Sequence, residues 1–74
     1  MEVKKPRVGE SAAWKWAGNI LEGVVLSVHP ERTEIVSKDK FIVRNGSLKN
    51  PAVIILYKNN TEVLKLASEL LATR

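Results

Sequence analysis

The stretch AVIILYKNNTEVLKL, residues 52–66, decides the fold because it contains two strand-like runs joined by a polar turn. The apolar run 52–57 has the length of a buried strand. Asn59 and Asn60 tolerate positive φ and are typical of a two-residue hairpin loop. We therefore predict an antiparallel hairpin over this stretch.

A two-residue loop fixes which residues of the hairpin lie opposite each other. The predicted pairs are Ile55 with Leu64, Val53 with Leu66, and Leu56 with Val63. Both faces of this hairpin are apolar, so another element must cover the second face. The candidates are Leu70 and Leu71 or a second copy of the chain, which would make a homodimer.

The tail beyond the hairpin supports two interpretations. Apolar residues recur at helical spacing between residues 61 and 73, which favours a helix. They are Val63, Leu66, Ala67, Leu70 and Leu71. The alternative is a strand that ends at Leu66, followed by a short helical turn that begins with Ser68 as its N-cap.

Further strand-like segments precede the hairpin. In residues 11–17, alternation places Trp14 and Trp16 on one face and Lys15 on the other. Gly18-Asn19 predicts the turn that follows, since both residues tolerate positive φ.

The next segment, residues 20–28, contains Gly23, which indicates a bulge or a sharp bend. Pro30 ends this strand because proline cannot donate to a strand ladder. Residues 31–39 form a charged loop in one interpretation, and in the other residues 33–36 continue the strand ribbon.

A short strand over residues 40–44 has Phe41 and Val43 on one face, and Asn45-Gly46 predicts a tight turn after it. With the hairpin, these segments supply the strands of a small barrel. The predicted fold class is mainly β, a five-stranded antiparallel barrel.

Length and composition place limits on the protein. Seventy-four residues make one small domain, which we assign to residues 8–74 after a flexible basic tail over residues 1–7. The net charge of +4 suits an anionic partner. Cysteine is absent, and no apolar stretch is long enough for a signal peptide or a membrane span, so we expect a cytoplasmic protein with no membrane partner.

Several short motifs follow one another in an order that resembles a known family. They are Val8-Gly9-Glu10, Trp14-Lys15-Trp16, Glu22-Gly23, Arg44-Asn45-Gly46-Ser47, Asn50-Pro51-Ala52, and Val63-Leu64-Lys65-Leu66 before Ser68-Glu69-Leu70. Over about residues 8–71 the chain resembles the small bacterial and fungal "hypervirulence-associated" Tudor-like domain, a domain of unknown function. The resemblance implies an SH3-like, Tudor-like five-stranded barrel with a short C-terminal helical turn. It implies no established biochemical activity.

The chain departs from the pattern of that family at two positions. Ala12 stands where members usually have a β-branched residue, and Val53 stands where an aromatic residue is common.

The candidate binding site is a rim of aromatic and polar side chains near the strand ends. Its residues are Trp14, Lys15, Trp16, Phe41, Arg44, Asn45 and Tyr57. Two tryptophans on one strand face suit an aromatic cage for a methylated cation. The simpler interpretation, which we favour, is that one tryptophan fills the core and the other caps its end.

Residues 44–47, Arg-Asn-Gly-Ser, also support two interpretations. In a recognition loop, Arg44 binds a phosphate or a carboxylate. In a structural turn, the Asn-Gly pair supplies positive φ, the serine bonds a loop amide, and Arg44 pairs with Glu69 or Glu62.

We predict a non-catalytic binding module that presents this rim to a protein or peptide, with self-association as one form of that role. The alternative is a nucleic-acid-binding barrel that uses basic side chains on its surface. Those side chains are Lys15, Lys38, Lys40, Lys58 and Lys65. No catalytic residue, metal ligand or cofactor is predicted, because His29 is the single histidine of a chain without cysteine.

Overall fold

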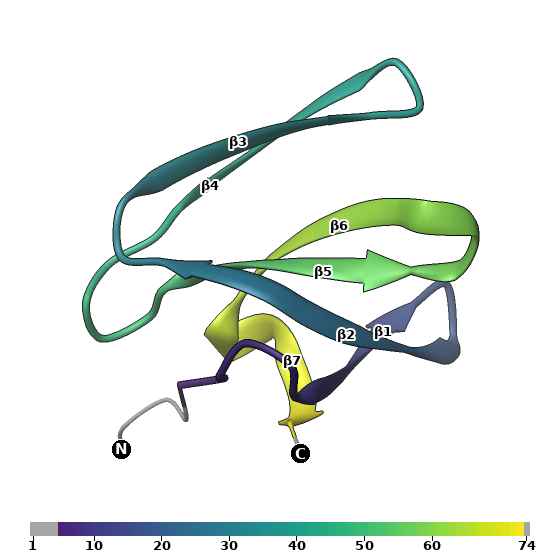
Figure 1. The fold of residues 1–74 in the computed structure, drawn as a ribbon, viewed down its shortest axis with the longest axis horizontal. Helices are drawn as coiled ribbons and strands as arrows, with labels where there is room; N and C mark the ends of the chain where they lie inside the picture. The colour runs from purple at the N-terminus through teal and green to yellow at the C-terminus, as the bar shows by residue number, and fades with distance from the viewer. Residues whose placement is uncertain (1–4, 74) are drawn as a thin grey trace.

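The computed structural model describes residues 5–73, which form strands and two short 3-10 turns (Figure 1). The elements are β1 (Ser11–Trp16), β2 (Asn19–His29), β3 (Arg32–Ser37), β4 (Lys40–Asn45), β5 (Ala52–Tyr57), η1 (Lys58–Asn60), β6 (Thr61–Leu66), η2 (Ala67–Glu69) and β7 (Leu70–Thr73). Five strands form one antiparallel sheet in the order β6-β5-β2-β1-β7, and β3 and β4 form a separate two-stranded sheet. The predicted mainly β, antiparallel fold class is confirmed.

The long strand β2 joins the two halves of the larger sheet. Its first part pairs with β1 and its second part with β5. Gly23 lies where these parts meet, and a Cβ there would stand 2.5 Å from the carbonyl oxygen of Leu56. The glycine therefore permits close strand approach, while the register shift lies farther along, between Val25 and Ser27. The bend predicted at Gly23 is thus a close contact followed by a bulge.

The turn between β1 and β2 begins one residue earlier than predicted. Trp16 pairs with Asn19, so Ala17 and Gly18 are the turn residues, with φ values of 49° and 81°. Positive φ at both central positions is the geometry of the tight turns that suit twisted hairpins.

The β5–β6 hairpin has a different register from the predicted one. Ile55 lies opposite Val63, and Ile54 opposite Leu64. The connection contains the three residues of η1 rather than two, which shifts every pair by one position. A register shift of one residue changes which side chains of β6 share a face of the hairpin with a given side chain of β5.

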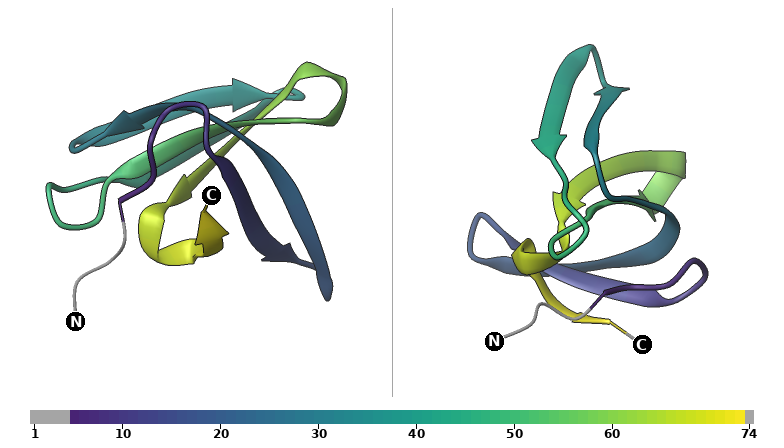
Figure 2. Two further views of the ribbon diagram at one scale, coloured as in Figure 1. Left: turned by 60° about the horizontal axis from the view of Figure 1, so that its bottom comes forward. Right: turned by 90° about the vertical axis from the view of Figure 1, so that its left-hand side faces the viewer.

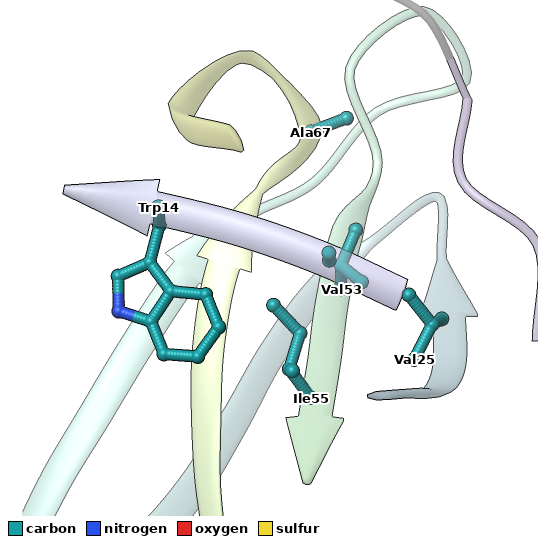
Figure 3. Close-up of a cluster of buried hydrophobic side chains, with 6 residues drawn as sticks. Trp14, Val25, Val53, Ile55 and Ala67 are labelled. Atoms are coloured by element: carbon teal, nitrogen blue, oxygen red, sulfur yellow. The ribbon is translucent and has the colours of Figure 1, made fainter. Parts of the chain in front are cut away.

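Two apolar clusters cover the two faces of this hairpin. The first contains Trp14, Val25, Val53, Ile55 and Ala67 (Figure 3) and lies between the hairpin and the β1–β2 part of the sheet. The second lies on the opposite face. It joins Ala52 and Leu64 to Ile35, with Ile42, Ile54 and Leu66 packed around them.

The β3–β4 hairpin therefore covers the second apolar face of the β5–β6 hairpin, for which the sequence suggested only Leu70 and Leu71 or a second copy of the chain. Figure 1 shows it on the side of β5 and β6 opposite β7. Residues 31–39, expected as a charged loop, contain β3, so the alternative strand interpretation was the right one. Leu70 packs instead on the first cluster and Leu71 is 55% exposed. The structural reason for a second copy of the chain no longer applies.

The tail resolves as strand, turn and strand. β6 ends at Leu66, η2 follows, and β7 pairs with β1 (Figure 2). The helical interpretation of residues 61–73 was wrong, and β7 was not predicted. The N-cap residue of this turn is Leu66, not Ser68, and the backbone N–H of Leu66 donates to the carboxylate of Glu69 at 2.8 Å.

The predicted tail, residues 1–7, lies partly outside the described residues, and its flexibility stays a prediction. Within residues 5–73, no helix is long and apolar enough to cross a membrane.

Candidate functional site

A groove of about 560 Å³ lies between β4 and β6, and we call it the aromatic groove. Residues 40–44 of β4 line one side, and residues 61–65 of β6 line the other. Aromatic and apolar side chains from other strands complete it: Trp14, Trp16, Leu21 and Tyr57. Ser37 and Lys38 complete the lining from the β3–β4 turn.

Five of the seven predicted site residues lie along this groove. They are Trp14, Trp16, Phe41, Arg44 and Tyr57. Lys15 is exposed and Asn45 is exposed at the end of β4, and neither lines the groove. Lys15 is excluded by strand alternation, which points it away from the tryptophan face of β1.

The two tryptophans of β1 have different roles although they share one face. Trp14 is 2% exposed and belongs to the first apolar cluster. Trp16 is 63% exposed because β1 ends there and the sheet no longer covers it. One tryptophan thus fills the core and the other stands at its end.

Trp14 and Tyr57 form an edge-to-face pair, with ring centroids 5.6 Å apart and an interplanar angle of 70°. An edge-to-face arrangement of two aromatic rings is electrostatically favourable, so it holds both side chains in place at the base of the groove. The ammonium of Lys58 lies 6.0 Å from the centroid of Tyr57. Trp14 lines the groove but is 2% exposed, so it offers very little surface to a ligand.

The exposed ring of Trp16 carries a cation from its own chain. The Nζ atom of Lys65 on β6 lies 5.5 Å from the centre of that ring, within the range of a cation–π contact. The opposite side of the groove presents Phe41, which is 64% exposed. Trp16 and Phe41 come from different sheets, and both line the groove.

Arg44 lines the groove, but its guanidinium binds Glu69. Nε of Arg44 lies 2.9 Å from Oε1 of Glu69, and Nη1 donates to the carbonyl of Val43 at 3.0 Å. Burial raises the pKa of Glu69, but the hydrogen bond from Leu66 and the Arg44 guanidinium together outweigh it and lower that pKa. Arg44 therefore joins the end of β4 to η2.

The Arg-Asn-Gly-Ser segment is a turn held by close packing. Positive φ, predicted for Asn45 and Gly46, occurs at neither residue. A Cβ at Gly46 would lie 2.6 Å from the carbonyl oxygen of His29 and 2.7 Å from the backbone nitrogen of Ala52. The hydroxyl of Ser47 accepts the N–H of Asn50 at 3.1 Å, as expected for a structural turn.

The amide of Asn50 links this turn to η2. Its Nδ2 donates to the hydroxyl of Ser68 at 3.0 Å, and its Oδ1 accepts the N–H of Ser68 at 2.9 Å. The Asn-Pro motif thus anchors the segment that turns β6 into β7.

Sequence reasoning did not identify the β6 side of the groove. Thr61, Glu62 and Val63 line it, and Lys65 stands there beside Trp16. These positions depend on a three-residue hairpin loop that residue preferences alone did not distinguish from a two-residue one. Lys38, Lys40 and Lys65 were predicted as part of a basic face, and they line the aromatic groove.

His29 makes two polar contacts outside the groove. Its Nε2 lies 2.8 Å from the hydroxyl of Ser27, and its Nδ1 lies 3.5 Å from a carboxylate oxygen of Glu31. Ser27 and His29 are two residues apart on β2 and therefore share one strand face, whereas Glu31 lies in the connection between β2 and β3. The part of the chain that the structure describes contains no group of three or more acidic, histidine or cysteine side chains able to hold a metal ion.

A family model described as "Hypervirulence associated proteins TUDOR domain" matches residues 9–70. The match includes every strand of the larger sheet except most of β7 and contains all residues of the groove. Searches of curated proteins and of solved structures gave no match.

Proposed function

The chain belongs to the hypervirulence-associated Tudor family, and we propose that it is a small, non-catalytic binding module that holds a protein or peptide segment in the aromatic groove. One observation carries the proposal. Trp16 and Phe41 come from different sheets, are each nearly two-thirds exposed, and line a single groove.

Exposed aromatic side chains of this kind are typical of binding surfaces. Tryptophan and tyrosine are enriched among the residues that contribute most to interface affinity, because they bury a large area at low entropic cost. The groove volume of about 560 Å³ also falls within the range of ligand sites. Trp14 and Tyr57 make the base rigid, so a ligand has little to reorganise on binding.

The shape of the groove favours a peptide. Its lining consists mainly of consecutive residues along two strands, so it extends in the direction of the strands. Val43, Val63 and Leu64 supply apolar surface within it. Alternating side chains of an extended peptide match such a surface.

Nucleic acid is the second candidate, because Lys38, Lys40 and Lys65 line the same groove as the exposed aromatics. Aromatic stacking combined with cationic side chains is how single strands are held without sequence preference. The peptide is favoured because Lys65 already covers one face of Trp16, where a base would stack.

Selection of random short peptides displayed on phage tests the proposal. We expect the wild-type protein to enrich peptides that lose binding to Trp16→Ala and to Phe41→Ala by about tenfold or more, the effect of an aromatic hot spot. The matched control is Ile20→Ala, since this side chain is 66% exposed and lies outside the groove.

Retention of the enriched peptides by both groove variants would overturn the proposal. So would a selection that enriches nothing while a single-stranded DNA probe binds with an affinity that falls steeply between about 50 and 200 mM salt.

A further inference from the structure

We propose that the segment held in the aromatic groove is an acidic peptide in the extended conformation, which adds as a strand to the free edge of β6. This inference rests on the proposed function and specifies the chemistry and conformation of the partner. It rests on three independent features of the groove: its strand edges, its charge and the state of its aromatic rings.

The first feature is that the groove lies between two strand edges. β6 pairs only with β5, and β4 pairs only with β3, among residues 5–73. Every second residue of an edge strand directs its N–H and C=O away from its partner. The groove is lined without interruption by residues 61–65 of β6, so an extended chain placed there meets these backbone groups.

The second feature is charge. Among residues 5–73, four cationic side chains line the groove against a single carboxylate, that of Glu62. Arg44 is held by Glu69, which leaves Lys38, Lys40 and Lys65 to face a ligand. Glutamate or aspartate side chains of an added strand would complement them, while its apolar side chains contact the apolar lining of the groove, to which Phe41 contributes.

The third feature is the state of the aromatic rings, which argues against a methylated cation as the ligand of the groove. A cage for such a ligand needs several open ring faces around one point. Trp14 is 2% exposed and forms an edge-to-face pair with Tyr57, and the ammonium of Lys65 lies over Trp16. A second cation near Trp16 would be repelled by Lys65, which lies over that ring, and by Lys38 and Lys40, which line the groove. An anionic side chain instead gains a partner in Lys65.

Synthetic peptides test both parts of the inference by calorimetry with the full chain. The probe is a short peptide in which glutamate alternates with valine around a central phenylalanine. Its counterpart carries lysine in place of glutamate. Two further versions of the acidic peptide are N-methylated, one at its odd and one at its even positions, because strand addition to one edge uses the N–H groups of alternate residues only.

We expect the acidic peptide to bind at least about tenfold more tightly than the lysine peptide. One N-methylated version should lose binding by about tenfold and the other should bind like the parent. The variant Lys40→Glu should weaken binding of the acidic peptide. Its matched control is Lys49→Glu, which makes the same charge change at an exposed residue outside the groove.

Each contrary result identifies the part that fails. Equal or tighter binding of the lysine peptide overturns the acidic preference, and parent-like binding of both N-methylated versions overturns strand addition. The proposed function survives either result. Loss of binding to Lys49→Glu as large as to Lys40→Glu places the peptide elsewhere on the surface. Failure of all four peptides overturns the inference, and the phage selection then decides on the proposed function alone.

Discussion

At the scale of single residues, the amino acid required at a position can depend on close contacts with distant parts of the chain, which conformational preferences of the local sequence do not reveal. Gly46 follows Asn45, and the pair predicted a turn with positive φ, whereas the glycine is needed because neighbouring backbone leaves no space for a Cβ. The pairing of Arg44 with Glu69 was predictable as one of two options because the charges are complementary. Which acid it meets depends on η2, a turn that no local pattern fixes.

Gly46→Ala should therefore destabilise the protein. A methyl group would meet the carbonyl of His29 and the nitrogen of Ala52, backbone atoms that cannot move aside independently. We expect a loss of about 1–3 kcal/mol in the free energy of unfolding, the range of overpacked sites, measured by urea denaturation. Asn45→Ala, a substitution at the exposed neighbouring position, is the control. A Gly46→Ala protein as stable as this control would show that the turn is looser than described.

Glu69 should make stability depend on pH. Its pKa is lower in the folded state than the ordinary value of about 4.5, so the unfolded state binds more protons at acidic pH. The stabilisation is complete above the ordinary pKa and is lost as pH falls through the folded pKa. We expect the free energy of unfolding to decrease less between about pH 6 and pH 3 in Glu69→Gln than in wild type. The same dependence in Glu69→Gln as in the control Glu22→Gln would contradict this account.

At the scale of elements, β1, β2, β4 and β5 were recognisable from alternation and turn residues. The missed features involve long-range pairing: β7 is only four residues long and is a strand because β1 lies beside it. β3 is rich in charge because one of its faces is exposed, and this pattern also resembles a loop. The hairpin register depended on one extra loop residue. The groove could not be predicted in full, because it requires β4 and β6 to face each other.

A substitution in the turn between β1 and β2 should raise the stability of the protein. Ala17 has a φ of 49°, which costs a residue with a Cβ about 1–2 kcal/mol. Asparagine tolerates this conformation and gives the Asn-Gly sequence preferred in such turns. We expect Ala17→Asn to raise the free energy of unfolding by about 0.5–1 kcal/mol. The measurement is a denaturation midpoint, and a lower midpoint for Ala17→Asn would contradict the turn geometry.

The β3–β4 hairpin should be held to the sheet by Ile35. This side chain is 7% exposed and packs with Ala52 and Leu64. We expect Ile35→Ala to cost about 2–4 kcal/mol, as for other buried isoleucines, and to increase amide hydrogen exchange in β3 and β4 first. Val36→Ala, at the adjacent position that is 68% exposed, should cost less than about 0.5 kcal/mol. An equal loss of unfolding free energy in the two variants would show that the face of the hairpin that carries Ile35 is not the one that packs on the sheet.

At the scale of the whole molecule, the second sheet has two consequences. It covers the apolar face of the β5–β6 hairpin, and it creates the groove with β6. Because that face is covered within one chain, we expect sedimentation velocity to show a monomer at about 100 μM, a concentration at which micromolar dimers persist. A dimer under these conditions would show that another surface of the chain associates with itself.

The proposed function requires the aromatic groove to be the binding surface. The decisive measurement is a ¹H–¹⁵N NMR titration of the full chain with the acidic alternating peptide. We predict shifts concentrated at residues 40–44 and 61–65 and at the indole N–H of Trp16, with the indole N–H of Trp14 much less affected. Shifts concentrated around Lys15, or spread evenly over the lysine-bearing surface, would show that the peptide does not bind in the aromatic groove.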